Sequence, residues 1–230
     1  MTFSVVGRCA RTGMVGVALS SSAVVVASRC AWTRAGVGAV ATLHITDPRL
    51  GALGLDLLER GYDAPTTRDA LVAAAGAQAP WRQLAIIDRA GRTASFTGQR
   101  CGTVSATAEG KDCASGCNVV ASERVPRAMV ETFEKSPPEA HLAERLMLAL
   151  EAGLAAGGEF MEERGAGLKV SDRQIWPLVD LRVDWHEQPV QELRRIWTDY
   201  RPHMDSYVAR ALDPDTAPPI VLRGARRKPT

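Results

Sequence analysis

The chain begins Met1-Thr2-Phe3-Ser4-Val5-Val6-Gly7-Arg8, and this stretch gives the clearest indication of the fold together with the run Met14-Val15-Gly16-Val17-Ala18-Leu19. Both runs are short, apolar and rich in β-branched residues, which is typical of buried strands. The polar segment between them ends in Thr12-Gly13, a turn signal. We therefore expect a β-hairpin at the start of the chain.

Along the rest of the chain, segments with the periodicity of strands alternate with segments that have the periodicity of helices. Strands are predicted at Ala23–Ala27, Val37–Ile45, Gln83–Ile87, Thr93–Thr97 and Leu178–Trp185, with a strand end at Asn118–Ala121. Helices are predicted to begin at Pro48, Thr66, Ser122, Pro138 and Pro189, and Gly102–Gly116 is predicted to be a long loop. Hairpins outnumber β-helix-β crossovers, so the order favours an α+β fold with antiparallel sheets and helices layered outside them.

Composition excludes several classes of function. The 230 residues include 28 lysines and arginines against 26 acidic residues, a net charge of +2, and aromatic residues make up 5%. This is the profile of a globular domain without the basic field or stacking surfaces of a nucleic-acid-binding protein. We expect one domain over residues 2–212, followed by a flexible tail over residues 213–230.

The start of the chain lacks the pattern of a secretory signal, and no apolar run approaches the roughly 20 residues of a membrane span. We therefore expect a cytoplasmic protein. The five cysteines (Cys9, Cys30, Cys101, Cys113, Cys117) have no C-x-x-C spacing, so we interpret them as reduced thiols and expect neither a metal nor a cofactor.

One motif gives an alternative to that expectation. Gly36-Val37-Gly38-Ala39-Val40-Ala41 matches the G-x-G-x-x-A form of a dinucleotide fingerprint. Such a site needs a helix that opens directly after the glycines, whereas a strand pattern continues here as far as Ile45. Close packing between strands is the better interpretation of these glycines.

Thr2 is the strongest candidate for chemistry. It is small, so removal of Met1 is expected, and the chain would then start with a hydroxyl and a free α-amine on the same residue. An α-amine with a pKa of about 7.7 to 8.0 can accept the hydroxyl proton near neutral pH. The residue would supply both a nucleophile and its base.

Further along, short motifs recur in a recognisable order. They are Thr2-Phe3-Ser4-Val5-Val6, Gly16-Val17-Ala18-Leu19 with Ser21, Trp32 to Thr42, Gly54 to Leu58, Arg82-Gln83-Leu84, Asp88 with Gly91, Phe96-Thr97-Gly98, Asn118, Leu146 to Gly153 and Asp180 to Asp184. In this order they resemble the bacterial DUF1028 family. That resemblance implies an N-terminal-nucleophile hydrolase fold, a four-layer αββα sandwich whose first residue is the nucleophile.

The resemblance also implies roles for further residues. By analogy with the fold, Ser21 or its neighbour Ser20 would touch the amine, Arg34 would hold the alkoxide, and Asn118 would orient the substrate or donate to an oxyanion. Thr42 and His44, at the end of a strand, are candidate substrate-binding residues. The expected activity is hydrolysis of an amide or imide bond in a small molecule, with no nucleic-acid or membrane partner. A homodimer is compatible with the sequence.

The chain departs from the family pattern at several positions. Leu43 replaces a usual glutamine, Cys117 replaces a glycine, and Gly158-Glu159 to Ala166 lacks the expected Arg, Gln and Ser. These differences leave two alternatives open: a shifted substrate, or a binding or scaffold protein of the same fold that does not catalyse. Dinucleotide binding through Gly36 and Gly38 is the third hypothesis.

Overall fold

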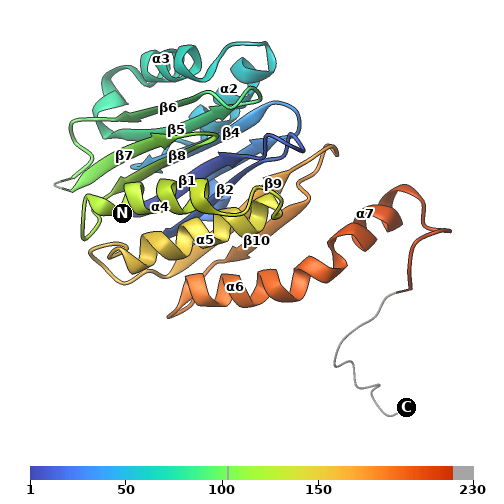
Figure 1. Ribbon diagram of the computed structural model, residues 1–230. Coiled ribbons are helices and arrows are strands. Elements are labelled where there is room, and N and C mark those ends of the chain that lie inside the picture. Colours follow the sequence, from blue (N-terminus) through green and yellow to red (C-terminus); the bar gives the residue numbers. More distant parts are fainter. Residues whose placement is uncertain (103, 220–230) are drawn as a thin grey trace.

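Two antiparallel sheets form the centre of the computed structural model, which describes residues 1–102 and 104–219. The first sheet has the order β10 (Val179–Val183), β9 (Gly165–Ser171), β2 (Val15–Ser21), β1 (Thr2–Arg8), β8 (Cys113–Asn118) and β7 (Ser105–Gly110). The second has the order β3 (Ala31–Arg34), β4 (Gly38–His44), β5 (Arg82–Asp88) and β6 (Thr93–Thr97). Figure 1 shows the two sheets stacked, with β1 and β2 central.

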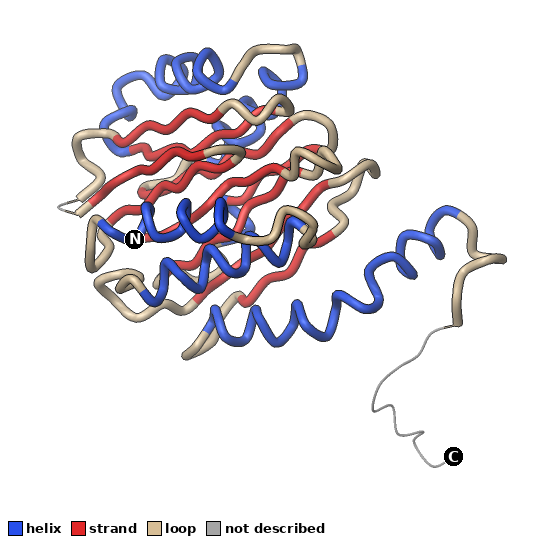
Figure 2. The backbone as a smooth tube through the Cα atoms, viewed as in Figure 1, coloured by secondary structure: helices blue, strands red, loops and turns tan. Residues whose placement is uncertain are grey.

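Helices cover both outer faces. The second sheet carries α2 (Pro48–Glu59) and α3 (Ala64–Ala75), and the first carries α4 (Arg124–Lys135), α5 (Leu142–Ala155) and α6 (Pro189–Tyr200). The shorter elements are α1 (Ala27–Cys30), the 3-10 turns Gly76–Trp81 and Arg201–His203, and α7 (Met204–Leu212), which leads away from the layered body. Figure 2 shows the strands between these helices, so the predicted α+β class with helices outside antiparallel sheets is confirmed.

Three apolar layers hold this stack together, and β1 contributes to two of them. Phe3 and Val5 pack against α4 and α5, whereas Val6 faces the second sheet. Because side chains alternate along a strand, Thr2 lies on the same side as Val6, toward the second sheet. Gly116 of β8 also lies there, and a Cβ at this position would be 3.0 Å from Leu43 of β4, so the two sheets approach closely near Thr2.

The hairpin at the start of the chain and the second hairpin, β5–β6, are confirmed. The strand predicted at Ala23–Ala27 is wrong: this apolar run is a turn with Val25 at a φ of 56°, leading into α1. The predicted loop Gly102–Gly116 is also wrong, because it contains β7 and the start of β8. These residues have weak strand propensity, and the pairing of β8 with β1 and of β7 with β8 overrides it.

Helix starts differ in detail from the sequence patterns. Asp63, rather than Thr66, caps α3, and its carboxylate accepts from the Thr66 amide. Helix α5 begins at Leu142, where the His141 ring accepts from the Ala143 amide, and not at Pro138. The predicted tail over residues 213–230 is described only as far as residue 219, so the remainder of that prediction lies outside the described residues.

The glycine motif does not form a dinucleotide site. Gly36 has a φ of 70° in the turn between β3 and β4, and the chain then continues as a strand. A Cβ at Gly38 would lie 2.4 Å from the Ile87 carbonyl oxygen, so close approach of neighbouring strands explains this glycine. The motif therefore lacks the helix N-terminus that would bind a pyrophosphate.

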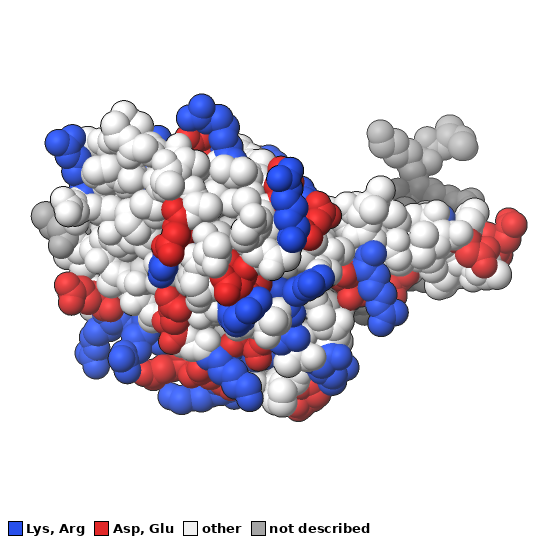
Figure 3. Space-filling view, turned by 90° about the horizontal axis from the view of Figure 1, so that it is seen from above, with Lys and Arg blue, Asp and Glu red and all other residues white. Residues whose placement is uncertain are grey.

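Surface charge is mixed. On the face seen in Figure 3, Lys and Arg side chains lie among Asp and Glu side chains rather than forming a field of one sign. In the described part of the chain, none of the helices has the length and apolar character that crossing a membrane requires.

Two leucines, one buried between the sheets and one at the surface, allow a test of this layer assignment. Leu43 is 1% exposed between the sheets, whereas Leu53, which the helical pattern places on the apolar face of α2, is 37% exposed. We predict that Leu43→Ala lowers the free energy of unfolding by about 2 to 5 kcal/mol, because it leaves a cavity that the stacked sheets cannot close. The matched control Leu53→Ala should change it by less than about 1 kcal/mol. Urea denaturation measures both, and equal losses would contradict the layer assignment.

Candidate functional site

A row of polar side chains crosses the first sheet where β1 begins. Thr2 pairs directly with Asn118 of β8, and the pairing of Phe3 with Ser20 places Thr2 opposite Ser21 of β2. Residues opposite one another in antiparallel strands project from the same face. Ser21, Thr2 and Asn118 therefore lie side by side on the face toward the second sheet, and all three are buried.

The hydroxyls of Thr2 and Ser21 converge on one carbonyl group. The Thr2 Oγ1 lies 3.4 Å from the Ser21 Oγ, and it also donates to the Met1 carbonyl oxygen. The Ser21 Oγ donates to that same oxygen at 2.6 Å and accepts from the Ala23 amide at 3.0 Å. Thr2 and Ser21 can thus act together on a carbonyl beside the start of β1.

Asn118 is held by a glutamine from the second sheet. Its Nδ2 donates to the Oε1 of Gln83 at 3.0 Å, and the Gln83 Nε2 donates to the Cys117 carbonyl at 2.8 Å and to the Thr97 Oγ1 at 3.0 Å. Gln83 is fully buried. The Asn118 Oδ1 is buried as well and has no hydrogen-bond partner among the described residues. An unpaired buried acceptor beside Thr2 is costly, so it is a candidate acceptor for a donor brought by a ligand or by a free amine.

A buried carboxyl group completes the cluster. Glu159, on the loop between α5 and β9, is 6% exposed, and its Oε2 accepts from the Ser22 amide at 3.0 Å. Its Oε1 is buried without a partner in the described part of the chain. Burial raises the pKa of Glu159 to about 7, although the hydrogen bond from Ser22 and the positive charge of the chain's amino terminus lower it in part. A carboxyl with this pKa can both give and take a proton near neutral pH.

The two candidate substrate-binding residues lie at the end of β4. The Thr42 hydroxyl donates to the Arg29 carbonyl at 3.2 Å on the buried side of the strand that faces α2, so it points away from the Thr2 row. The His44 Nδ1 lies 3.0 Å from the Trp81 carbonyl oxygen, and the His44 ring stacks on Trp81. Burial lowers the pKa of His44, and the charges of the amino terminus and Arg82 lower it further, which favours a neutral ring.

Arg34 is not part of this cluster. It pairs with Gly38 at the opposite end of β4 from His44. Its guanidinium forms ion pairs with Asp56 at 3.0 Å and Glu59 at 2.8 Å on α2. The structure therefore brings Ser21 and Asn118 to Thr2 and leaves Arg34 as a surface ion pair on another edge.

Two residues of the cluster were not among the sequence candidates. Gln83 lies in a predicted strand and in the motif Arg82-Gln83-Leu84, but that motif gives it no role, and Glu159 appears in the sequence only as a variation in a polar loop. A buried carboxyl could not be recognised there without the fold. All five cysteines are free and buried, and across residues 1–102 and 104–219 no three potential metal ligands are grouped together.

Comparison with known proteins places the chain in a family. Residues 2–193 match the family of unknown function DUF1028. The chain belongs to this family. No curated protein sequence matches it.

A solved structure supports the fold of this DUF1028 member. A DUF1028 protein from Silicibacter pomeroyi is 24% identical and superposes with a TM-score of 0.79. The alignment covers 86% of this chain and 88% of the Silicibacter chain. Two structures of Anbu are more distant. The protein from Hyphomicrobium sp. strain MC1 is 12% identical over 90% of this chain and 97% of that one, with a TM-score of 0.40. The ancestral β-subunit from Yersinia bercovieri is 9% identical over 89% and 97%, with a TM-score of 0.38.

The Glu159 carboxyl generates a pH prediction. Its pKa is raised from about 4.3 in an unfolded chain to about 7, so the folded state favours the protonated form. The stability of the wild type relative to Glu159→Gln should therefore be highest at or below about pH 4, and should fall by on the order of 2 kcal/mol as the pH rises through 7.

Urea denaturation between pH 5 and pH 8 measures this difference, and the same substitution at the exposed Glu187 is the control. A difference between wild type and Glu159→Gln that does not change with pH would show that Glu159 ionises normally.

Proposed function

We propose that this protein is an N-terminal-nucleophile amidohydrolase that cleaves an amide or imide C–N bond in a small molecule. The observation that carries the proposal is the convergence of the Thr2 and Ser21 hydroxyls on one carbonyl at the start of β1. A substrate carbonyl in that place would meet the nucleophile and a second hydroxyl donor together. The proposal requires removal of Met1, which frees the Thr2 amine.

The reaction would then follow from the groups in place. The Thr2 Oγ attacks the carbonyl carbon while its α-amine takes the hydroxyl proton. The Ser21 hydroxyl donates to the developing oxyanion, and the amine passes its proton to the leaving nitrogen. Water, deprotonated by the same amine, then hydrolyses the ester and releases the acid.

Asn118 and Glu159 would support the amine in this scheme. The unpaired Asn118 Oδ1 is an acceptor for one ammonium N–H, and Gln83 holds the Asn118 amide in place. The unpaired Oε1 of Glu159 is a second acceptor near the amino terminus. With a pKa close to 7, Glu159 would exchange a proton with the amine as the reaction proceeds.

A binding protein that does not catalyse is the second candidate. Thr2 is only 4% exposed beneath Met1, and Leu43 brings an apolar side chain to the inner layer where the family usually has glutamine. In such a protein the Thr2 hydroxyl would serve only to satisfy the carbonyl of Met1.

Covalent labelling distinguishes the two candidates. A β-lactone probe should esterify Thr2, because attack by Oγ opens the ring and the released alkoxide takes the proton. We expect Thr2→Ser to be labelled and Thr2→Ala to be unlabelled at residue 2, as measured by mass spectrometry of the N-terminal peptide.

An insertion separates the hydroxyl from the amine. Lysine placed between Met1 and Thr2 should prevent removal of methionine, so the hydroxyl stays but the free threonine amine is lost. We expect labelling to fall at least about a hundredfold in this variant, since a positioned base contributes that much or more. Labelling of the insertion variant at the wild-type rate, or no labelling of the wild type, would reject the mechanism.

A further inference from the structure

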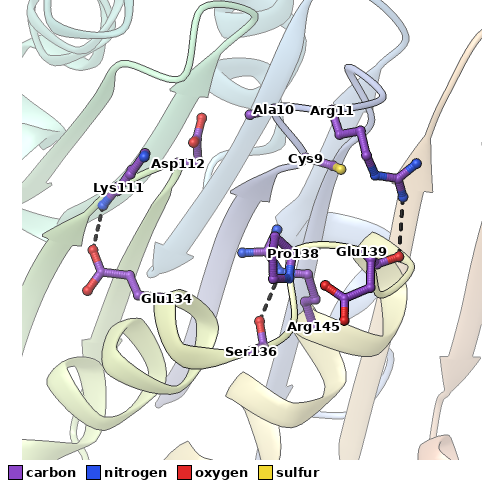
Figure 4. Close-up of a pocket in the computed structure, with 10 residues that line it drawn as sticks. All are labelled: Cys9, Ala10, Arg11, Lys111, Asp112, Glu134, Ser136, Pro138, Glu139 and Arg145. Carbon is purple, nitrogen blue, oxygen red and sulfur yellow. Dashed lines mark hydrogen bonds between the residues drawn. The ribbon is translucent and has the colours of Figure 1, made fainter.

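A cavity lies beyond the other end of β1, away from the Thr2 cluster. It has a volume of about 470 Å³ and is bounded by the loop after β1, the turn between β7 and β8, and the connection between α4 and α5. Figure 4 shows Cys9, Ala10 and Arg11 on one side, Lys111 and Asp112 on another, and Arg145 below. Strand β1 is seven residues long and begins at Thr2, so Thr2 and the cavity beyond its other end are about 20 Å apart.

A buried guanidinium forms the floor of the cavity. Arg145 of α5 is 8% exposed, and its Nε donates to the Ser136 Oγ at 2.8 Å while its Nη2 donates to the Phe133 carbonyl at 3.1 Å. The Arg145 Cζ lies 4.1 Å from the centre of the Phe133 ring. Both hydrogen-bond acceptors are neutral, and in the described part of the chain no carboxylate lies within ion-pair distance of Arg145.

A buried positive charge needs compensation. Phe133 is in the last turn of α4, whose C-terminus carries about half a negative charge, so the helix offsets part of the Arg145 charge. Among the described residues, no carboxylate lies close enough to pair with the remainder of this charge, and an isolated buried charge is strongly unfavourable. A bound anion would supply the missing partner.

The geometry limits which anion fits. The Nε–H and one N–H of Nη2 are already engaged, so both N–H groups of Nη1 and the second N–H of Nη2 are left to donate. At the rim, the carboxylates of Glu134 and Glu139 disfavour a doubly charged ligand. Asp112 is already paired with Arg8 at 2.7 Å. One buried donor group among rim carboxylates suits a single negative charge.

We propose that this cavity binds a small monocarboxylate with an apolar body. The carboxylate would accept from Arg145, and the apolar body would lie against Cys9, Ala10 and Pro138, which line the cavity. The exposed Arg11 and Lys111 at the rim would steer the anion inward. This site is separate from Thr2 and does not depend on the amidohydrolase proposal.

Isothermal titration calorimetry with three probes tests the site. Hexanoate should bind at least about tenfold more tightly than hexanamide, which has the same shape without the charge, because a charged acceptor strengthens the hydrogen bond. Inorganic phosphate should bind more weakly than hexanoate. The Thr2→Ala variant should bind hexanoate like the wild type, which separates this test from that of the proposed reaction.

Two variants locate the binding. Arg145→Met should remove hexanoate binding, and Arg34→Met, at an exposed ion pair elsewhere, should leave it unchanged. Since Arg145 also bonds the end of α4, its variant can fail to fold. Ala10→Trp fills the cavity from an exposed position and leaves the Arg145 contacts intact, so it should also abolish binding.

The outcomes that overturn the proposal are specific. They are equal binding of hexanoate and hexanamide, tighter binding of phosphate, hexanoate binding that survives in Ala10→Trp, or no binding of hexanoate to the wild type at millimolar concentration. The last result would leave Arg145 with a structural role alone, at the C-terminus of α4.

Discussion

The pairing register of β1 between β2 and β8 is the constraint on which the candidate site depends. It places Thr2 opposite Ser21 on one side and Asn118 on the other. A slip of one residue would turn every side chain of the strand to the opposite face. The register is fixed because Phe3 and Val5 must lie under α4 and α5 while Val6 lies between the sheets. The hydrophobic layers thus determine where the Thr2 hydroxyl points.

The second constraint is electrostatic and comes from a loop. The segment between α5 and β9 brings Glu159 to the Ser22 amide, directly after Ser21 at the end of β2. Its carboxyl is kept from water, which raises its pKa, and the positive charge of the amino terminus lowers that pKa in part. Together with Asn118, Glu159 gives this end of the inter-sheet layer two buried acceptors that have no hydrogen-bond partner among the described residues. Unsatisfied polar groups of this kind are common where a ligand or a reacting group belongs.

Much of the frame could be predicted from local sequence, and the exceptions share a physical reason. The β1–β2 and β5–β6 hairpins and helix α2 carry strong local patterns, and the structure has them. The strands β7, β8 and β9 are built from small and polar residues, so their conformation is set by strand pairing, of β8 with β1, β9 with β2 and β7 with β8, and not by propensity. The position of Ser21 beside Thr2 is expected from the family resemblance, and the register of the β1–β2 hairpin agrees with it. Gln83 and Glu159 could not be found in this way, because their burial arises only when the layers assemble.

The two ends of β1 thus differ chemically. Near its first residue lie the Thr2 and Ser21 hydroxyls and the Glu159 carboxyl with a pKa of about 7, and beyond its last residue lies the buried guanidinium of Arg145. The proposed reaction takes place at the first end, and it requires threonine to carry the free amine. Intact mass and N-terminal sequencing of the protein purified from its own cells show whether it does. We predict a chain that lacks methionine and starts with Thr2. A mature chain that still carries Met1 would contradict the proposed mechanism, because the Thr2 nitrogen would then be a peptide amide and not a free amine.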